Sequence, residues 1–436
     1  MSVPDAVGPR TPREALSAAP GAGTGAHAAP AVGPSDPSPA VPHAPRLAVV
    51  GNPDNRRVAL FAQAVRAAGL PGPRVVPWID VLREGGADFA PDETVRLDSP
   101  GEDPEIDRLL RDAGDPARVE GSARWYARFT AAVATLRGGV RLDDPDDLAV
   151  LFDKRRCHAV LDAAGVPVPA SPTSGPDGAP VRGWDDVRSL MRAHRMPRLF
   201  VKLAHGSSAS GVLAVETAGA RIRATTSVER APDGRLYNSL KVRRYESEQE
   251  IAAIVDTLAH DGLHLERWLP KASQQGRAAD LRVVVVAGRA THAVVRTSRA
   301  PMTNLHLGGT RGDLDAAREA VERAGARWAD VLQVCERAAA CFPRTLCVGV
   351  DLLPATGWRR FVVGEVNAFG DLLPGLTGLP GSGAESADTY AAQVAAVLHG
   401  PGATGSHARP GPRHSRSGPA DAPDHGSRLP RHPSHT

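Results

Sequence analysis

The chain has 436 residues, of which 42% are hydrophobic, 23% charged and only 4% aromatic, with a formal net charge of +3. This length exceeds what a single hydrophobic core usually supports, so we expect more than one domain. No stretch approaches 18 apolar residues and no long basic run occurs, which argues against a membrane span and against nucleic-acid binding. The N-terminus lacks a charged start followed by an apolar region, so no secretory signal is expected. Four cysteines without paired or metal-ligand spacing favour a reduced protein of the cytoplasm.

The two ends of the chain differ from its middle. Residues 1–45 and 401–436 contain no aromatic residue and are rich in Pro and Gly. Such segments bury too little apolar surface to offset the entropy of ordering them, so we predict that both are disordered. The remainder divides into an N-terminal α/β domain over residues 46–148 and a larger domain over residues 149–400.

The N-terminal domain begins with a βαβ pattern. Residues 46–51 form a short apolar strand, and a helix follows with apolar positions from Val58 to Ala68 and a stop at Gly69. Residues 74–78 are the second strand. The turn after the first strand lacks the glycine pattern of a dinucleotide site. Residues 98–145 are expected to be mostly helical.

The larger domain alternates strands with a few helices. Helices are predicted over residues 154–164, over a long stretch at 313–341, and at 387–399. Predicted strands are 198–203, 212–216, 262–269, 281–287, 291–297, 346–353 and 360–367. The last two form a hairpin around Thr356-Gly357, so their polar residues are expected to lie close together. No internal repeat is visible.

A small-residue loop follows Lys202 at the end of one strand. It contains Gly206 and Gly211 around three serines. Small residues allow backbone N–H groups to approach phosphate oxygens, and the lysine supplies a point charge. A plain hairpin loop is an equally good interpretation, and the order of residues is not that of a Walker motif.

An acidic cluster occupies the final hairpin. Glu365 and Asn367 are two residues apart and therefore share one face of a strand, and Asp351 lies on the neighbouring strand. Two carboxylates and an amide oxygen are hard ligands that suit Mg²⁺. A structural polar patch on the exposed face of an antiparallel sheet explains the spacing equally well.

The order of these features along the chain is more specific than any one of them. Between the loop and the hairpin lie Glu266, Asp280-Leu-Arg282, Arg296 and Thr303–Gly309. Over roughly residues 150–375 this order resembles the ATP-grasp superfamily, and most closely carboxylate–amine ligases such as the ribosomal-protein glutamate ligases and bacterial glutathione synthetases. The similarity is strongest in the segments 303–309, 348–353 and 364–368.

The resemblance implies an α/β fold in which a βαβ (pre-ATP-grasp) domain precedes a two-lobed ATP-grasp core, with a hinge near residues 266–270. It also implies roles for individual residues. ATP would be bound by Lys154, Lys202, the loop residues His205, Gly206, Ser207, Ser208 and Gly211, the hinge residues Glu266 and Arg267, and Asp280 and Asn304. The catalytic arginines would be Arg282 and Arg296, facing the γ-phosphate and the acyl-phosphate. The ligands of Mg²⁺, or of Mn²⁺ in its place, would be Asp351, Glu365 and Asn367.

The implied activity is an ATP- and Mg-dependent carboxylate–amine or carboxylate–thiol ligase that acts through an acyl-phosphate on a small-molecule or peptide substrate. Two alternatives stay open: an ATP-grasp phosphotransferase with a hydroxyl acceptor, and an ATP-binding partner protein without turnover. The metal trio disfavours the second. A polar insertion separates Glu266 from Asp280, and residues 369–375 match no one subfamily, so neither the substrate pair nor the oligomeric state is predicted.

Overall fold

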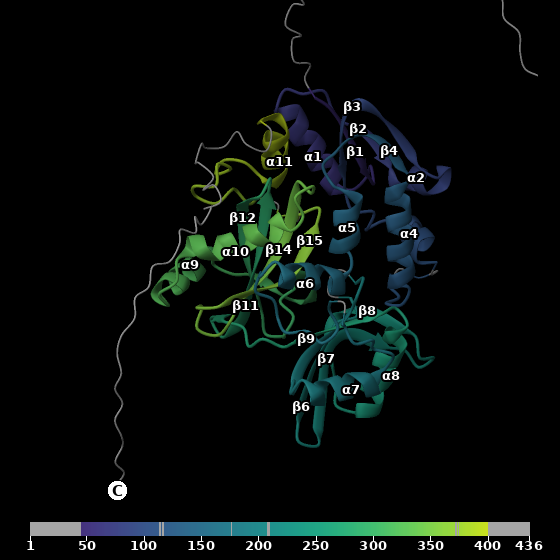
Figure 1. Cartoon of the computed structure of the whole chain (residues 1–436), viewed down its shortest axis with the longest axis vertical. Helices are drawn as coiled ribbons and strands as arrows, with labels where there is room; N and C mark the ends of the chain where they lie inside the picture. The colour runs from purple at the N-terminus through teal and green to yellow at the C-terminus, as the bar shows by residue number, and fades with distance from the viewer. Residues whose placement is uncertain are drawn as a thin grey trace, which may run out of the picture. The chain divides into compact units, whose positions relative to one another are not determined.

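The computed structural model describes residues 45–399 except 113, 114, 116, 176, 207–209, 371, 372 and 374 (Figure 1). The segments predicted to be disordered lie outside the described residues, apart from Pro45. The described residues form a mixed α/β fold with one parallel and two antiparallel sheets. No helix in the described part of the chain is long and apolar enough to cross a membrane.

The first sheet is parallel, with the strand order β2-β1-β3-β4. Its strands are β1 (Arg46–Gly51), β2 (Arg74–Pro77), β3 (Ala87–Leu97) and β4 (Leu136–Arg141). Successive residues of β1 are buried on opposite faces, which is why its sequence is continuously apolar. Helix α1 (Arg56–Ala67) packs against one face. The other face is covered by α2 (Trp78–Glu84), α3 (Pro104–Arg111), α4 (Ser122–Ala134) and α5 (Pro145–Leu151).

The βαβ beginning is confirmed, but residues 98–145 are not mostly helical: they contain α3 and α4, and then the strand β4. The sequence does not predict β4, because two of its residues are glycines, Gly138 and Gly139, with φ of 72° and 65°. A Cβ at Gly138 would lie 2.2 Å from the carbonyl oxygen of Phe89 on the neighbouring strand. Only glycine allows this approach, so close packing rather than strand propensity determines the residue.

The second sheet is antiparallel, with the strand order β8-β7-β6-β5-β9. Its strands are β5 (Arg198–Leu203), β6 (Leu213–Ala218), β7 (Arg221–Arg230), β8 (Leu236–Tyr245) and β9 (Leu263–Arg267). Helices α7 (Trp184–Ala193) and α8 (Glu248–Ala259) pack their apolar residues against it. The predicted strands at 198–203, 212–216 and 262–269 correspond to β5, β6 and β9, whereas β7, β8, α7 and α8 were not predicted.

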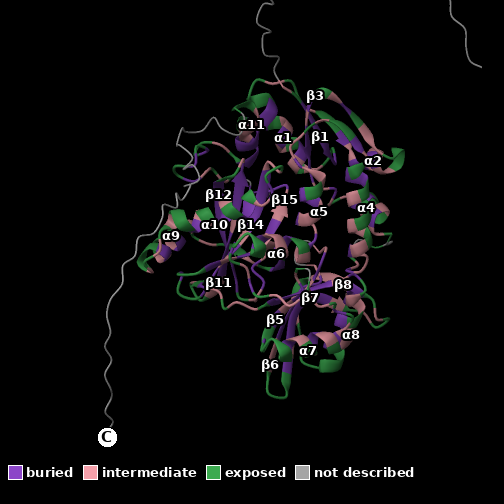
Figure 2. Cartoon of the chain, in the orientation of Figure 1, coloured by how far each residue is buried: buried purple, intermediate pink, exposed green. Residues whose placement is uncertain are grey.

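The third sheet is also antiparallel, with the order β13-β12-β11-β14-β15 and β10 beside β11. Its strands are β10 (Ser273–Gln274), β11 (Arg277–Val286), β12 (Arg289–Ser298), β13 (Thr310–Arg311), β14 (Cys347–Pro354) and β15 (Phe361–Ala368). Helices α6 (Lys154–Ala163), α9 (Leu314–Arg323) and α10 (Trp328–Ala340) pack on one core with this sheet. Helix α11 (Thr389–His399) contributes to a second cluster with β11, β12 and β14. Figure 2 shows buried residues along these central strands.

The long helix predicted over residues 313–341 is wrong, because α9 and α10 are separate helices. The chain leaves α9 at Ala324 and turns at Gly325, whose φ is 83°. A straight helix of that length would span roughly 43 Å at 1.5 Å per residue, more than a sheet of short strands can cover. The turn allows both helices to bury apolar residues in the same core.

Candidate active site

A cavity of about 480 Å³ brings together residues of the two antiparallel sheets. Arg57 and Ser99, which follow strands of the parallel sheet, also line it. Among the described residues, twelve of the predicted site residues are in its lining. They are Lys154, Lys202, Gly206, Glu266, Arg267, Asp280, Arg282, Arg296, Asn304, Asp351, Glu365 and Asn367.

The predicted glycine loop is only partly in this lining. Ser207 and Ser208 lie outside the described residues. The His205 ring stacks on Tyr126 with 4.0 Å between ring centroids, and its Nδ1 lies 3.0 Å from the Phe152 carbonyl oxygen. Burial lowers the pKa of His205. Gly211 has φ of 68°, and a Cβ there would lie 2.6 Å from Leu203 Cδ1, so close packing explains this glycine.

Strands β5 and β9 place Lys202 beside Glu266. Lys202 pairs in register with His264, two residues before Glu266, so all three side chains share one face of the sheet. Lys202 Nζ donates to Glu266 Oε2 at 2.6 Å, and His264 Nε2 lies 3.0 Å from Glu266 Oε1. Burial by itself would raise the pKa of Glu266, but the ammonium of Lys202 and the His264 hydrogen bond hold it well below its usual range. The carboxylate is therefore ionised.

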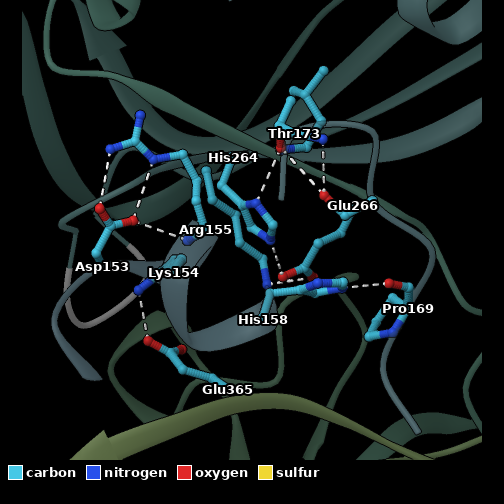
Figure 3. A network of polar contacts seen from close by, with 12 residues as sticks. Asp153, Lys154, Arg155, His158, Pro169, Thr173, His264, Glu266 and Glu365 are labelled. Carbon is cyan, nitrogen blue, oxygen red and sulfur yellow. Dashed lines mark hydrogen bonds and ion pairs between the residues drawn. The ribbon is translucent and has the colours of Figure 1, made fainter. Parts of the chain in front are cut away.

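Lys154 connects three segments of the site. It is the first residue of α6, whose N-cap Asp153 accepts hydrogen bonds from two backbone N–H groups. Its Nζ donates to the Gly206 carbonyl oxygen at 2.6 Å. It also donates to Glu365 Oε1 at 2.6 Å (Figure 3). The start of the glycine loop, α6 and β15 thus meet at one ammonium group.

The predicted metal ligands lie on paired strands. Asp351 is directly opposite Glu365, and Asn367 is opposite Gly349. The side-chain N–H of Asn367 donates to the Gly349 carbonyl oxygen at 3.2 Å. The side-chain oxygen is therefore the atom that could act as a metal ligand. No group of three or more His, Cys, Asp or Glu side chains among the described residues is arranged to hold a metal. Two carboxylates and one amide suit a cation that keeps water or phosphate oxygens as further ligands, which is typical of Mg²⁺.

Both predicted catalytic arginines contact Asp351. Arg282 pairs in register with Asp351 and binds both of its oxygens, and Arg296 Nη2 lies 2.9 Å from Asp351 Oδ1. Arg296 Nε also donates to Asp280 Oδ1 at 2.8 Å. Burial opposes ionisation of Asp351, yet the two guanidinium groups hold its pKa well below the usual range.

Sequence reasoning missed Lys271, which also lines the cavity. Its Nζ donates to Thr303 Oγ1 at 2.9 Å and lies 3.6 Å from Asp280 Oδ2. Burial lowers the pKa of Lys271. Lys271 lies in the segment interpreted as a polar insertion. The signal that could have found it is the scarcity of lysine: the chain contains only four, and three of them line this cavity.

Asn304 has a local structural role as well. Its Oδ1 accepts the His306 N–H at 2.8 Å and so caps the short 3₁₀ helix η1 (Leu305–Leu307). The capping bond explains an asparagine at this position without a ligand.

The lining of the cavity carries an excess of positive charge. Eight basic side chains face four carboxylates, a formal excess of four positive charges. The basic residues are Arg57, Lys154, Lys202, Arg267, Lys271, Arg282, Arg296 and Arg311, and the acidic ones are Glu266, Asp280, Asp351 and Glu365. Such an excess attracts a polyanion such as a nucleotide triphosphate.

No protein-family model matches the chain, and no curated protein matches it. Solved structures do resemble it. The D-cycloserine synthetase DcsG is 17% identical with a TM-score of 0.47, covering 81% of this chain and 99% of its own. The ATP-grasp ligase PsnB complexed with a minimal precursor is 16% identical with a TM-score of 0.46, covering 81% and 98%. The D-alanine–D-alanine ligase from Bacillus anthracis complexed with ATP is 14% identical with a TM-score of 0.42, covering 82% and 97%. The solved structures that resemble this chain thus include an ATP-grasp ligase, a synthetase and a further ligase.

Proposed function

We propose that the chain is an ATP- and Mg-dependent carboxylate–amine ligase of the ATP-grasp type. The observation that carries the proposal is the convergence of Lys154, Lys202, two arginines and the Asp351–Glu365 pair in one cavity with an excess of positive charge. A structural polar patch has no need for such an excess, whereas a bound triphosphate does.

The cavity lining supplies groups that suit both the base and the phosphates of ATP. Phe200, Val212 and Met302 supply an apolar wall, which fits the adenine ring. Lys154 and Lys202 supply point charges for the phosphates. In this conformation each ammonium is held by a carboxylate at 2.6 Å, so binding of the nucleotide exchanges one anionic partner for another.

The residues also fit a magnesium ion. Asp351, Glu365 and Asn367 would hold it, and Glu365 would exchange Lys154 for the metal. When bound, the ion neutralises charge on the phosphates. Arg282 and Arg296, which hold Asp351, would then stabilise the phosphoryl group during transfer.

The proposed chemistry has two steps. An oxygen of the substrate carboxylate attacks the γ-phosphorus of ATP, the bond from that phosphorus to the bridging oxygen breaks, and ADP leaves. The amine nitrogen then attacks the carbonyl carbon of the acyl-phosphate, the carbon–oxygen bond to phosphate breaks, and the amine proton passes to solvent. Positioning and charge neutralisation are sufficient for these steps, so no protein nucleophile is required.

The acceptor is proposed to be a small-molecule or peptide carboxylate, with an amine as its partner. Arg57 and Ser99 extend the lining to the parallel sheet, so the predicted domain of residues 46–148 would form part of the substrate site. A location in the cytoplasm agrees with the four free cysteines.

The test is the release of ADP and phosphate from Mg-ATP with a panel of carboxylates and amines, repeated with hydroxylamine. A ligase yields a hydroxamate, because hydroxylamine captures the acyl-phosphate. A phosphotransferase yields a stable phosphorylated product, no free phosphate and no hydroxamate, and a binding protein yields neither product; either result would contradict the proposal. Arg296→Gln should abolish hydroxamate formation, whereas Arg318→Gln, an exposed change on α9, should leave it intact.

A further inference from the structure

We infer that His264 is a positioning residue of the nucleotide pocket, holding the Glu266 carboxylate and, through it, the Lys202 ammonium. The inference rests on the proposed function, because it assumes that Lys202 contacts the phosphates of ATP. It concerns a residue that neither the motif order nor the cavity lining singles out.

His264 lies on β9, two residues before Glu266, and is fully buried. Both nitrogens of its ring have polar neighbours (Figure 3). Nε2 is 3.0 Å from Glu266 Oε1, and Nδ1 is 3.1 Å from Thr173 Oγ1. A buried histidine so close to an ionised carboxylate can contribute either to packing alone or to the orientation of that carboxylate, and the hydrogen-bond directions distinguish the two.

The surrounding donors determine which ring nitrogen carries the hydrogen. Thr173 Oγ1 accepts the Leu265 N–H at 2.8 Å, which leaves its own hydrogen for a second partner. Ser171 Oγ, 3.2 Å away, already accepts the Thr173 N–H and can donate its hydroxyl hydrogen in turn. Because the ionised Glu266 carboxylate can only accept, Nε2 carries the hydrogen, and Nδ1 of the neutral ring accepts the Thr173 hydroxyl hydrogen. Burial lowers the pKa of His264, in agreement with a neutral ring.

The direction of the His264–Glu266 hydrogen bond matters because the two oxygens of Glu266 have different partners. Oε1 is held by His264, and Oε2 binds Lys202 at 2.6 Å. If His264 did not donate, the carboxylate could turn and offer both oxygens to the ammonium, which would hold Lys202 more tightly and away from phosphate. The neutral donor thus limits Glu266 to a single contact with the lysine.

His158 provides a matched control within the same network. It is also buried, and its ring centroid is 5.3 Å from that of His264. Its Nε2 lies 2.6 Å from the Pro169 carbonyl oxygen, so that nitrogen must donate (Figure 3). The two histidines are therefore both buried and lie next to each other. Among the contacts of the described residues, His264 hydrogen-bonds Glu266 and His158 does not.

The experiment compares two neutral amide substitutions in the full chain. The side-chain nitrogen of glutamine reaches about as far as Nε2 of histidine, whereas asparagine falls short. Calorimetric titration with ATP in the absence of divalent cations should show about tenfold weaker binding for His264→Asn and a change of less than about threefold for His264→Gln, as expected for one charge-assisted hydrogen bond. His158→Asn should bind ATP within about twofold of the parent. In a Glu266→Gln background the difference between the two His264 variants should disappear.

The outcomes separate the inference from the function on which it rests. Equal ATP affinities of His264→Asn and His264→Gln, or a difference that persists in the Glu266→Gln background, would overturn the positioning role, because both variants remove the same ring. If the parent binds ATP and Lys202→Ala weakens that binding, such a result refutes only the role of His264. If the parent does not bind ATP, the proposed function fails and the inference fails with it.

Discussion

Glu365→Gln is the sharpest perturbation of the proposed site. The change is nearly isosteric and removes one negative charge from the Asp351–Glu365–Asn367 group. Glu365 bonds Lys154 at 2.6 Å, and the two side chains are 30% and 14% exposed. Loss of a pair with this partial exposure should lower the free energy of unfolding by only about 1 kcal/mol. Each carboxylate of the paired strands already has a cationic partner, so relief of repulsion between them should not stabilise the variant.

The effect on magnesium should be much larger than the effect on stability. Removing a charged ligand should weaken magnesium-dependent ATP binding by about a hundredfold, or about 3 kcal/mol. Binding of ATP without magnesium should stay the same or become slightly tighter, since Lys154 is released from Glu365 and becomes available to the phosphates. The change therefore separates the metal contribution from the nucleotide contribution.

The measurement is calorimetric titration of ATP with and without Mg²⁺, on the parent and on Glu365→Gln. Glu216→Gln is a matched control, because Glu216 is 28% exposed and is bonded to Arg223 at 2.6 Å on β6 and β7, outside the cavity lining. The control should keep the magnesium dependence of the parent. An identical magnesium dependence in Glu365→Gln and the parent would refute the metal assignment.

Three further predictions follow from the same structure. Lys202→Ala should weaken ATP binding in a calorimetric titration by about 1.5–3 kcal/mol. Lys202→Arg should not restore the affinity, because the planar guanidinium differs in shape from the ammonium. The control Lys241→Ala, on the exposed part of β8, should bind ATP as the parent does. Burial raises the pKa of Asp143 to about 6, so the folded chain binds its proton more tightly than the unfolded chain. Lowering the pH from 7.5 to 5 should therefore add about 1 kcal/mol to the free energy of unfolding from this group, and denaturant titrations at both pH values should show that contribution missing in Asp143→Asn. Cys341 is partly exposed while the other three thiols are buried, so one equivalent of a thiol reagent should react before the others, although burial raises the pKa of the Cys341 thiol and slows its reaction. Reaction of all four thiols at one rate would contradict this packing.

The chain's local patterns were sufficient for much of the fold. Strands such as β1, β5 and β15 have apolar residues and clear flanking turns, and each lies where its pattern predicted. The resemblance carried by the order of lysine, glycine loop, Asp-x-Arg and Glu-x-Asn likewise singled out twelve residues that line the cavity. These signals are local, because they depend on side-chain periodicity and on the spacing of polar residues within a strand.

Tertiary contacts decided the rest. Strand β4 exists because Gly138 and Gly139 fit closely against β3, and α9 and α10 are separate because both pack in one core. His264 is an ordinary strand residue in the sequence, and Thr173, which contacts its ring, lies 91 residues away along the chain. Lys271 reaches Thr303 across 32 residues of chain. Contacts between distant segments depend on which strands pair and how helices pack, and the residues themselves carry no local mark of them.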